Sequence, residues 1–250
     1  MSIWAIADLH LALSVPDKSM EFFGGSWIGY VEKIKTYWNE SVQPEDLVLV
    51  PGDISWGIRL EEAKADLDWI HELPGTKVML RGNHDYWWGS LTKLEKFMPP
   101  SIHVIQNNSF LWGDVAIAGS RLWDTSEYSF GDYIEYQANP RAKKMTDPQE
   151  PDIQERERIF ARELLRLEQS LKSISPKAKK RIAMTHYPPI GANLHPSKAS
   201  AILEKYGIEV CVFGHLHHIR SCSLLMGAAR GVEYHLVAAD YLNYHPLKLT

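Results

Sequence analysis

The sequence has little cysteine, little net charge and no long hydrophobic run. Only two of its 250 residues are cysteines. This argues against a disulfide scaffold and favours free, buried thiols for Cys211 and Cys222. The net charge of −4 gives no electrostatic reason to expect nucleic acid as an obligatory partner. No apolar run is long enough to cross a bilayer, and the first residues lack the pattern of a secretory signal. We therefore expect a cytoplasmic protein without an obligatory membrane partner.

What is present is the composition of an ordinary globular protein, with 45% apolar and 23% charged residues. Short apolar runs bounded by turn residues predict strands at 2–7, 47–50, 77–80, 103–105, 114–119, 181–184, 209–213 and 233–239. Helical patterns lie between many of them, at about 27–40, 59–72, 90–97, 152–173 and 197–206. Strands that alternate with helices predict a layered α/β fold with mixed sheets.

The segment from about 121 to 175 differs from the rest. It begins as a polar loop rich in tyrosine, aspartate and turn formers, and it continues into an amphipathic helix. The apolar stripe of that helix consists of Phe160, Leu164, Leu167 and Leu171. The loop is either a wall or lid of a substrate site or a plain insertion, since long loops in compact domains are often functional.

Polar side chains follow five of the apolar runs. They are Asp8 and His10, Asp53, Asn83-His84-Asp85, His186, and finally His215 and His217. Taken one by one, such residues are common at turns. Because ligands bind at the carboxyl ends of strands in α/β sheets, we expect these side chains to converge on one site.

Such a site would be rich in carboxylates and imidazoles, with one amide. Packing them together without cations is costly, because like charges repel and burial removes their hydration. A pair of divalent cations removes this cost, and the mixed ligand set suits Mn, Fe or Zn better than Ca. Two metals close together can hold the attacking and leaving oxygens of a displacement at phosphorus. Phosphoryl transfer is therefore the favoured chemistry.

The ordered motifs D-x-H, G-D, G-N-H-D, H and G-H-x-H, spread from Asp8 to His217, resemble those of the calcineurin-like metallophosphoesterase family. The resemblance implies a four-layer α-β-β-α sandwich of two mixed β-sheets with flanking helices. A single domain would span residues 1–250, with the 121–175 segment as its insertion. It also implies hydrolysis of phosphomonoesters, phosphodiesters or pyrophosphates by direct attack of a metal-bound hydroxide.

The resemblance also implies residue roles. Asp8, His10 and His217 would hold one metal, Asn83, His186 and His215 the other, and Asp53 would bridge the two. His84 would be the general acid that protonates the leaving oxygen, and Asp85 would orient its ring. We expect two divalent ions, Mn first, with Fe or Zn as alternatives, and a small phosphorylated molecule as the substrate.

At two positions the sequence departs from the motifs of the family's subgroups, and this reduces the range of expected activities. Trp56 stands where purple acid phosphatases carry an iron-ligating tyrosine, and the stretch GDISWG lacks the arginine of phosphoprotein phosphatases. An obligatory ferric site and Ser/Thr phosphatase activity are therefore not expected. Among Arg59, Arg81 and Arg121, we favour Arg121 as the guanidinium that binds substrate phosphate, with a surface salt bridge as the alternative.

Two other functions stay open. The same fold could serve as a non-catalytic scaffold that binds a protein, although this chain has the full ligand set. It could also be a nuclease of the same family, although the net charge argues against that. Trp87 and Trp88 are interpreted as core or groove wall, and Asp240-Tyr241 as a turn after the last strand. The sequence does not indicate the oligomeric state.

Overall fold

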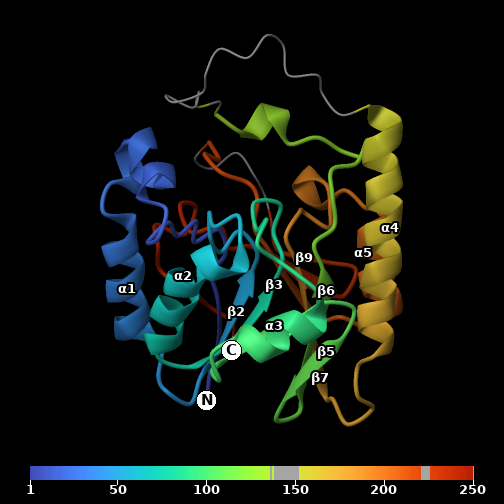
Figure 1. Cartoon of the computed structure of the whole chain (residues 1–250). Coiled ribbons are helices and arrows are strands. Elements are labelled where there is room, and N and C mark those ends of the chain that lie inside the picture. Colours follow the sequence, from blue (N-terminus) through green and yellow to red (C-terminus); the bar gives the residue numbers. More distant parts are fainter. Residues whose placement is uncertain (136, 138–151, 221–225, 250) are drawn as a thin grey trace.

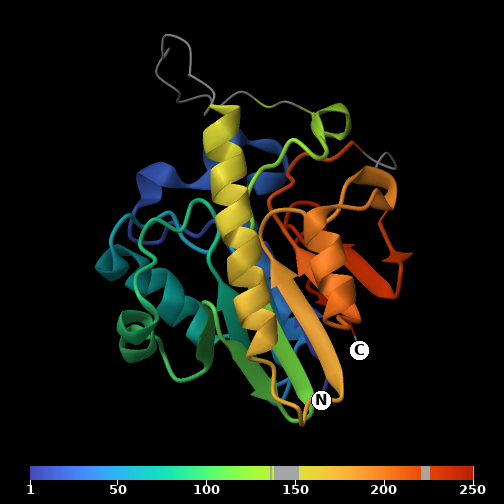
Figure 2. The ribbon, with the colours of Figure 1, turned by 90° about the vertical axis from the view of Figure 1, so that its right-hand side faces the viewer.

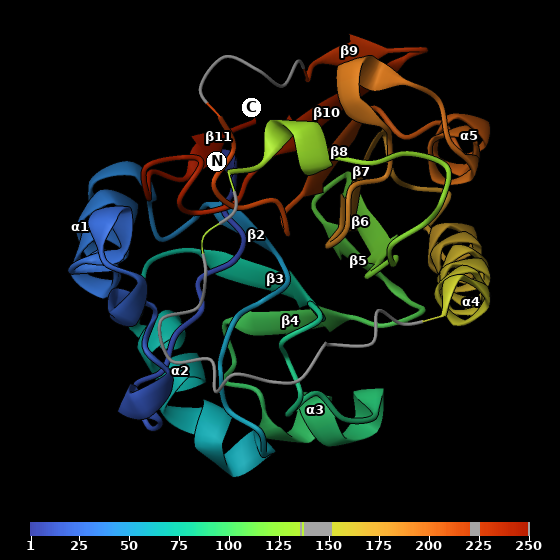
Figure 3. The ribbon, with the colours of Figure 1, turned by 90° about the horizontal axis from the view of Figure 1, so that it is seen from above.

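The computed structural model describes residues 1–135, 137, 152–220 and 226–249. Two mixed β-sheets face each other, and helices cover the outer face of each sheet (Figure 1). Seen from above, the layers follow one another as helices, sheet, sheet and helices (Figure 3). The four-layer α/β sandwich predicted from the sequence is confirmed.

The first sheet has the strand order β11-β1-β2-β3-β4. Its parallel strands are β1 (Ile3–Ala5), β2 (Leu47–Pro51), β3 (Thr76–Leu80) and β4 (Ile102–Ile105). The short strand β11 (Leu247–Lys248) pairs antiparallel with β1 at one edge. The carboxyl ends of the four parallel strands therefore lie at the same edge of this sheet.

The second sheet has the order β5-β6-β7-β8-β10-β9. Its parallel strands are β6 (Val115–Ser120), β7 (Lys180–Thr185), β8 (Val210–Phe213) and β10 (Val232–Leu236). Antiparallel strands close both edges, namely β5 (Ser109–Trp112) and β9 (Ala228–Ala229). The pair β5–β6 is a hairpin around Gly113-Asp114.

Five α-helices form the outer layers of the described chain. They are α1 (Tyr30–Ser41), α2 (Leu60–Glu72), α3 (Leu91–Phe97), α4 (Ile153–Lys172) and α5 (Lys198–Lys205). The first three lie on the side of the first sheet and the last two on the side of the second (Figure 3). Each agrees with the helix predicted from the sequence to within three residues at either end. Short 3-10 helices at Pro16–Lys18, Met20–Phe23 and Gly25–Trp27 precede α1.

Three apolar clusters fill the spaces between the layers. In β2, Leu49 belongs to the cluster between the two sheets, whereas Val48 and Val50 belong to the cluster under α1 and α2. All three side chains are fully buried. This explains why the strand is a continuous apolar run, as parallel strands covered on both faces are.

The helix predicted after the polar loop is α4, which lies along the second sheet (Figure 2). Its residues Phe160, Leu167 and Leu171 are buried against that sheet, and Leu164 is half-buried beside them. The Oγ of Ser170 accepts a hydrogen bond of 2.8 Å from the backbone N–H of Gly119 in β6. The helical part of the 121–175 segment is therefore a layer of the fold. Residues 138–151 of its loop lie outside the described residues.

The cysteine prediction is tested in part. Cys211 in β8 is a free, buried thiol, and burial raises its pKa to about 12. Cys222 lies outside the described residues. Across the described ranges, no helix has both the length and the apolar character needed to cross a membrane.

Candidate metal centre

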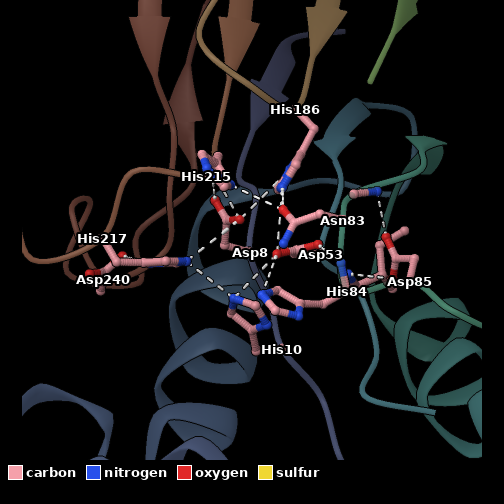
Figure 4. Close-up of polar contacts among 12 residues, drawn as sticks. Asp8, His10, Asp53, Asn83, His84, Asp85, His186, His215, His217 and Asp240 are labelled. Atoms are coloured by element: carbon pink, nitrogen blue, oxygen red, sulfur yellow. Dashed lines mark hydrogen bonds and ion pairs between the residues drawn. The ribbon is translucent and has the colours of Figure 1, made fainter. Parts of the chain in front are cut away.

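The predicted polar residues meet at the carboxyl ends of strands from both sheets (Figure 4). The first sheet supplies the residues that follow β1, β2 and β3, and the second sheet supplies those that follow β7 and β8. The convergence predicted from the strand ends is therefore observed. In Figure 4 His84 and the candidate ligands point toward one shared space, with Asp8 and Asp53 near its centre, whereas Asp85 lies to one side and Asp240 lies behind His217.

The backbone of this site is strained at the residues predicted as ligands. Asp8, His10, Asp53 and His215 have φ angles of 58°, 45°, 51° and 70°. Residues other than glycine rarely adopt such angles, and the conformation costs of order 1–3 kcal/mol at each position. Four such residues in one place indicate that the fold tolerates local strain here to aim these side chains.

Two glycines of the motifs permit the close packing of the carboxylates. A Cβ atom on Gly82 would lie 2.1 Å from the Asp53 Oδ1, and one on Gly214 would lie 2.3 Å from the Asp8 Oδ2. Neither position has room for a side chain. The glycine before Asn83 and the glycine before His215 are thus required by the approach of the two aspartates.

One group of three potential metal ligands consists of Asp8, His10 and His217, with ligand atoms within 4.8 Å of one another. The Nε2 atoms of His10 and His217 are 3.2 Å apart, although 207 residues separate them in the sequence. The Nε2 of His217 lies 3.8 Å from the Asp8 Oδ1. This is the set expected to hold one of the two metals.

A second group consists of Asp8, Asp53 and His186. The Asn83 Oδ1 lies 2.6 Å from the Nε2 of His186 and 3.1 Å from the Nδ1 of His215. The Nε2 of His186 is also 3.5 Å from the Asp53 Oδ2. Asn83 and His215 thus lie beside the second group. Asp8 belongs to both groups, whereas the residue expected to be shared was Asp53, which is in the second group.

The hydrogen bonds of His186 test whether this second group fits a cation. Its Nδ1 lies 3.0 Å from the Pro51 carbonyl oxygen, which can only accept, so this nitrogen carries the proton. In the neutral ring, Nε2 then presents a lone pair to the Asn83 oxygen, which is also an acceptor. Two facing lone pairs repel, and a cation bound by both atoms removes the repulsion. The donor set therefore fits a metal ion.

The electrostatics of the site agree with this result. Burial raises the pKa of Asp8 well above its usual range and also raises that of Asp53. Burial lowers the pKa of His10, His186 and His215 well below the usual value. A site of this kind is costly to charge in the absence of cations. Bound cations would reverse the shift of the carboxylates, because they favour the ionised form, and would further favour the neutral imidazoles that burial already favours.

Asp240 is a site residue that sequence reasoning missed. Its Oδ1 lies 2.9 Å from the Nδ1 of His217, and its Oδ2 accepts a 3.1 Å hydrogen bond from the His218 backbone N–H. Burial alone would lower the pKa of His217, but Asp240 and then Asp8 raise it to about 9. The backbone of Asp240 is in a turn, as predicted. Asp240 follows the apolar run 233–239, and this position could have identified it, since the candidate ligands were identified in the same way.

A model of the calcineurin-like phosphoesterase family matches residues 1–218. The chain belongs to this family. It is 31% identical over 84 residues to the Gene 66 protein of Mycobacterium phage D29, an alignment that covers 34% of this chain and 40% of that protein. The chain thus spans less than half the length of this curated relative.

Two solved structures align over nearly the whole of this chain. The phosphopantetheinyl hydrolase of Mycobacterium tuberculosis aligns over 99% of this chain and 95% of its own, with a TM-score of 0.57 and 14% identity. A purple acid phosphatase from yellow lupin seeds aligns over 99% of this chain and 44% of its own, with a TM-score of 0.46 and 12% identity. At these identities the first likeness supports the phosphoesterase fold and nothing finer.

The role expected for Asp85 in this phosphoesterase is corrected by the structure. Its carboxylate accepts hydrogen bonds from the backbone N–H groups of Ile54, Ser55 and Gly82 at 2.9, 3.2 and 2.7 Å. The Nδ1 of His84 is buried and has no hydrogen-bond partner among the described residues. Asp85 therefore fixes the loops after β2 and β3 and does not orient the His84 ring by a hydrogen bond.

The His84 ring instead packs against an aromatic neighbour. The Trp56 ring lies 4.5 Å from the His84 ring, centroid to centroid, and it stacks on His10 at 5.1 Å. The Nε2 of His84 faces the Asp53 Oδ2 at 4.0 Å. Burial lowers the pKa of His84, and the Asp53 carboxylate partly offsets this. The ring is thus aimed at the centre from a half-buried position.

Arg121 lies after β6, beside the centre but not among its hydrogen bonds. Its Nη2 is 3.6 Å from the Glu163 Oε1 on α4, and its guanidinium lies 4.5 Å from the Trp123 ring centre. The carbonyl oxygen of Arg121 accepts hydrogen bonds from the N–H groups of His186 and Tyr187. The guanidinium is therefore a near neighbour of the centre that is held by a buried carboxylate.

Proposed function

We propose that this phosphoesterase is a hydrolase that uses two divalent cations to cleave a small phosphomonoester or phosphodiester. The observation that carries the proposal is the meeting of carboxylate, imidazole and amide ligands from both sheets in one buried, strained site. Membership of the family supports it independently. The cytoplasmic location expected from the sequence belongs to the same proposal.

The ligands divide into two sets with one residue between them. We assign Asp8, His10 and His217 to the first cation, Asn83, His186 and His215 to the second, and Asp53 to both. The Asp53 Oδ2 supports the shared place, since it lies 3.7 Å from the His10 Nε2 and 3.5 Å from the His186 Nε2. When bound, the cations would activate water as the nucleophile and neutralise charge on the phosphoryl group. We expect Mn²⁺ first, with Fe or Zn as alternatives, because imidazole and carboxylate ligands suit these ions.

His84 is assigned as the proton donor. In the hydrolysis, the oxygen of water forms a bond to phosphorus and the bond from phosphorus to the leaving oxygen breaks. His84 gives a proton to that leaving oxygen, and the proton released by water restores the ring. A phosphate dianion beside His84 would raise its pKa and favour the protonated ring needed for this step.

Arg121 is assigned to the phosphoryl group of the substrate. Its positive charge lowers the pKa values of Asp53 and His186, so its guanidinium lies within electrostatic reach of both. Glu163 would hold the guanidinium in place for a bidentate contact with phosphate oxygens.

The experiment that tests the proposal is hydrolysis of an aryl phosphomonoester and an aryl phosphodiester by protein stripped with a chelator. We expect turnover only after Mn²⁺ is restored, and the ratio of the two rates identifies the preferred ester. Asp53→Asn should lose both metal and turnover. Wild-type protein that holds two metals and cleaves neither ester would contradict the proposal and favour the scaffold.

A further inference from the structure

An apolar pocket of about 350 Å³ lies next to the metal centre. Its apolar walls are Phe22, Phe23, Trp56, Ile58 and Tyr86, and we call it the Trp56 pocket. Asp17, Lys18 and Ser19 complete its lining. Its volume is within the range of small-molecule sites, which are mostly apolar cavities of roughly 300–1,000 Å³.

The exposure of these side chains sets the pocket apart from the core. Phe22, Ile58 and Tyr86 are 39%, 50% and 54% exposed. Single exposed apolar residues are normal, but several that line one cavity indicate a binding surface. In contrast, Trp87 and Trp88 next to Tyr86 are buried in the core, which is one of the two positions expected for them from the sequence.

Trp56 connects this pocket to the metal centre. Its ring lines the pocket and also stacks on the ring of His10, at 5.1 Å and 20° between the planes. The same ring lies 4.5 Å from that of His84, and the Tyr86 ring lies 6.3 Å from His84 on a perpendicular plane. Trp56 and Tyr86 therefore border both the pocket and the ring of His84, whose Nε2 faces Asp53.

We propose that the Trp56 pocket binds the leaving group, and that the substrate is a phosphoester of an apolar alcohol or phenol. This inference rests on the proposed function. A proton donor must touch the oxygen that it protonates, so the leaving oxygen lies at His84. The group attached to that oxygen then extends away from Asp53, toward Trp56 and Tyr86. Apolar walls there favour an apolar group.

A larger cavity near the site does not adjoin His84, as the site of the leaving group must. It has about 510 Å³ and is lined by aromatic and aliphatic side chains, among them Trp123, Phe130 and Tyr187, as well as by polar residues such as Asp124 and Glu157. Its difference from the Trp56 pocket is therefore its position and not its polarity. It borders the metal ligand His215, which lies away from His84 in Figure 4. The group released with the proton of His84 therefore does not enter it.

The test uses phenyl phosphates with a para substituent of hydrogen, methyl, propyl or pentyl. These substituents change the apolar size of the leaving group and scarcely change the pKa of its phenol. With the Mn²⁺-loaded protein, kcat/KM should rise two- to fourfold per methylene, since burying a methylene contributes about 0.8 kcal/mol, or about fourfold. Calorimetry with the matching phenylphosphonates, which cannot be hydrolysed, should show the same slope in Kd.

Phe22→Ala and Ile58→Ala should make kcat/KM and Kd depend less on the length of the para substituent. Both substitutions remove walls of the pocket, and neither residue belongs to a ligand set. Ile28→Ala is the matched control, since Ile28 is 56% exposed and does not line the pocket. It should keep both slopes. Trp56 is not substituted, because its contacts with His10 and His84 would disturb the centre itself.

A flat slope in wild-type Kd would overturn the inference, whether or not the esters are cleaved. Slopes that survive in both pocket variants would overturn it too. A Kd that falls as the para substituent lengthens, without turnover of any ester, would support the pocket and contradict the hydrolase. The two proposals therefore fail separately.

Discussion

Asp240 is a residue outside the proposed ligand set that positions one member of that set. Its Oδ1 lies 2.9 Å from the Nδ1 of His217. This contact fixes the ring so that its Nε2 faces the centre. A carboxylate behind a ligating histidine also increases the basicity of that ligand. The family motifs end at His217, so Asp240 stands beyond them at the end of a different strand.

Asp240→Ala should weaken the binding of one Mn²⁺ by roughly 10- to 100-fold, the usual cost of losing the partner of a ligand. Calorimetric titration of the stripped protein measures both affinities. Asp114→Ala is the control, because Asp114 is an exposed carboxylate in the β5–β6 turn that pairs with Lys179. Equal loss in the two variants, or none in Asp240→Ala, would contradict the role of Asp240.

His84→Ala should keep both metals and lose about 10²- to 10⁴-fold in turnover, the usual contribution of a general acid. The loss should be smaller for an ester whose phenol is strongly acidic, because that oxygen leaves without help. Rates for phenyl and nitrophenyl phosphate, with metal content measured on the same samples, check this. A fully active variant would refute the assignment of His84.

At the scale of elements, Lys77 links the end of α2 to β3. Its side chain is fully buried and its Nζ donates hydrogen bonds to the Leu73 and His71 carbonyl oxygens. A cation at a helix carboxyl end is favourable, but burial lowers the pKa of Lys77 to about 8 from 10.5. The folded state therefore binds this proton less tightly than the unfolded state.

Between pH 8 and pH 10.5 the unfolded chain keeps a proton on Lys77 that the folded chain has lost. The free energy of unfolding should therefore rise with pH across this window, relative to Lys77→Met, by at most about 3 kcal/mol. Urea unfolding of both proteins at pH 7, 8, 9 and 10 measures this difference. A constant difference would show that the Lys77 pKa is not lowered.

At the scale of the whole molecule, the candidate metal centre draws its residues from both sheets. Asp8 and Asp53 follow strands of the first sheet, whereas His186 and His217 follow strands of the second. Cations held by both sets would act as a bridge between the sheets, and the unfolded chain lacks that arrangement. Metal binding should therefore stabilise the fold as a unit.

Mn²⁺ at about 100 times its Kd should stabilise the folded protein by about 2.7 kcal/mol for each site. Thermal unfolding with Mn²⁺ and with chelator measures this as an increase in Tm. Asp53→Asn is the control and should show little or no increase. A wild-type Tm that is the same in both conditions would argue against a bridging centre.

Most of the fold, and the residues that gather at the candidate site, were predictable because both depend on local signals. The apolar run 47–50 had to be a strand covered on both faces, and the stripe from Phe160 to Leu171 had to be a helix with one buried side. Asp53 and Asn83 were identified by their places after apolar runs. These signals lie within a few residues of each other in the chain.

Other features depended on the order of the strands and were settled only by the tertiary structure. Periodicity does not reveal that β10 lies beside β8 and so brings Asp240 to His217. It also does not reveal that Asp85 binds backbone N–H groups of another loop, or that Trp56 lies against His84. The sequence by itself determined which side chains stand at strand ends. Packing of the two sheets decided which of those ends meet, because contacts between distant segments depend on the whole arrangement.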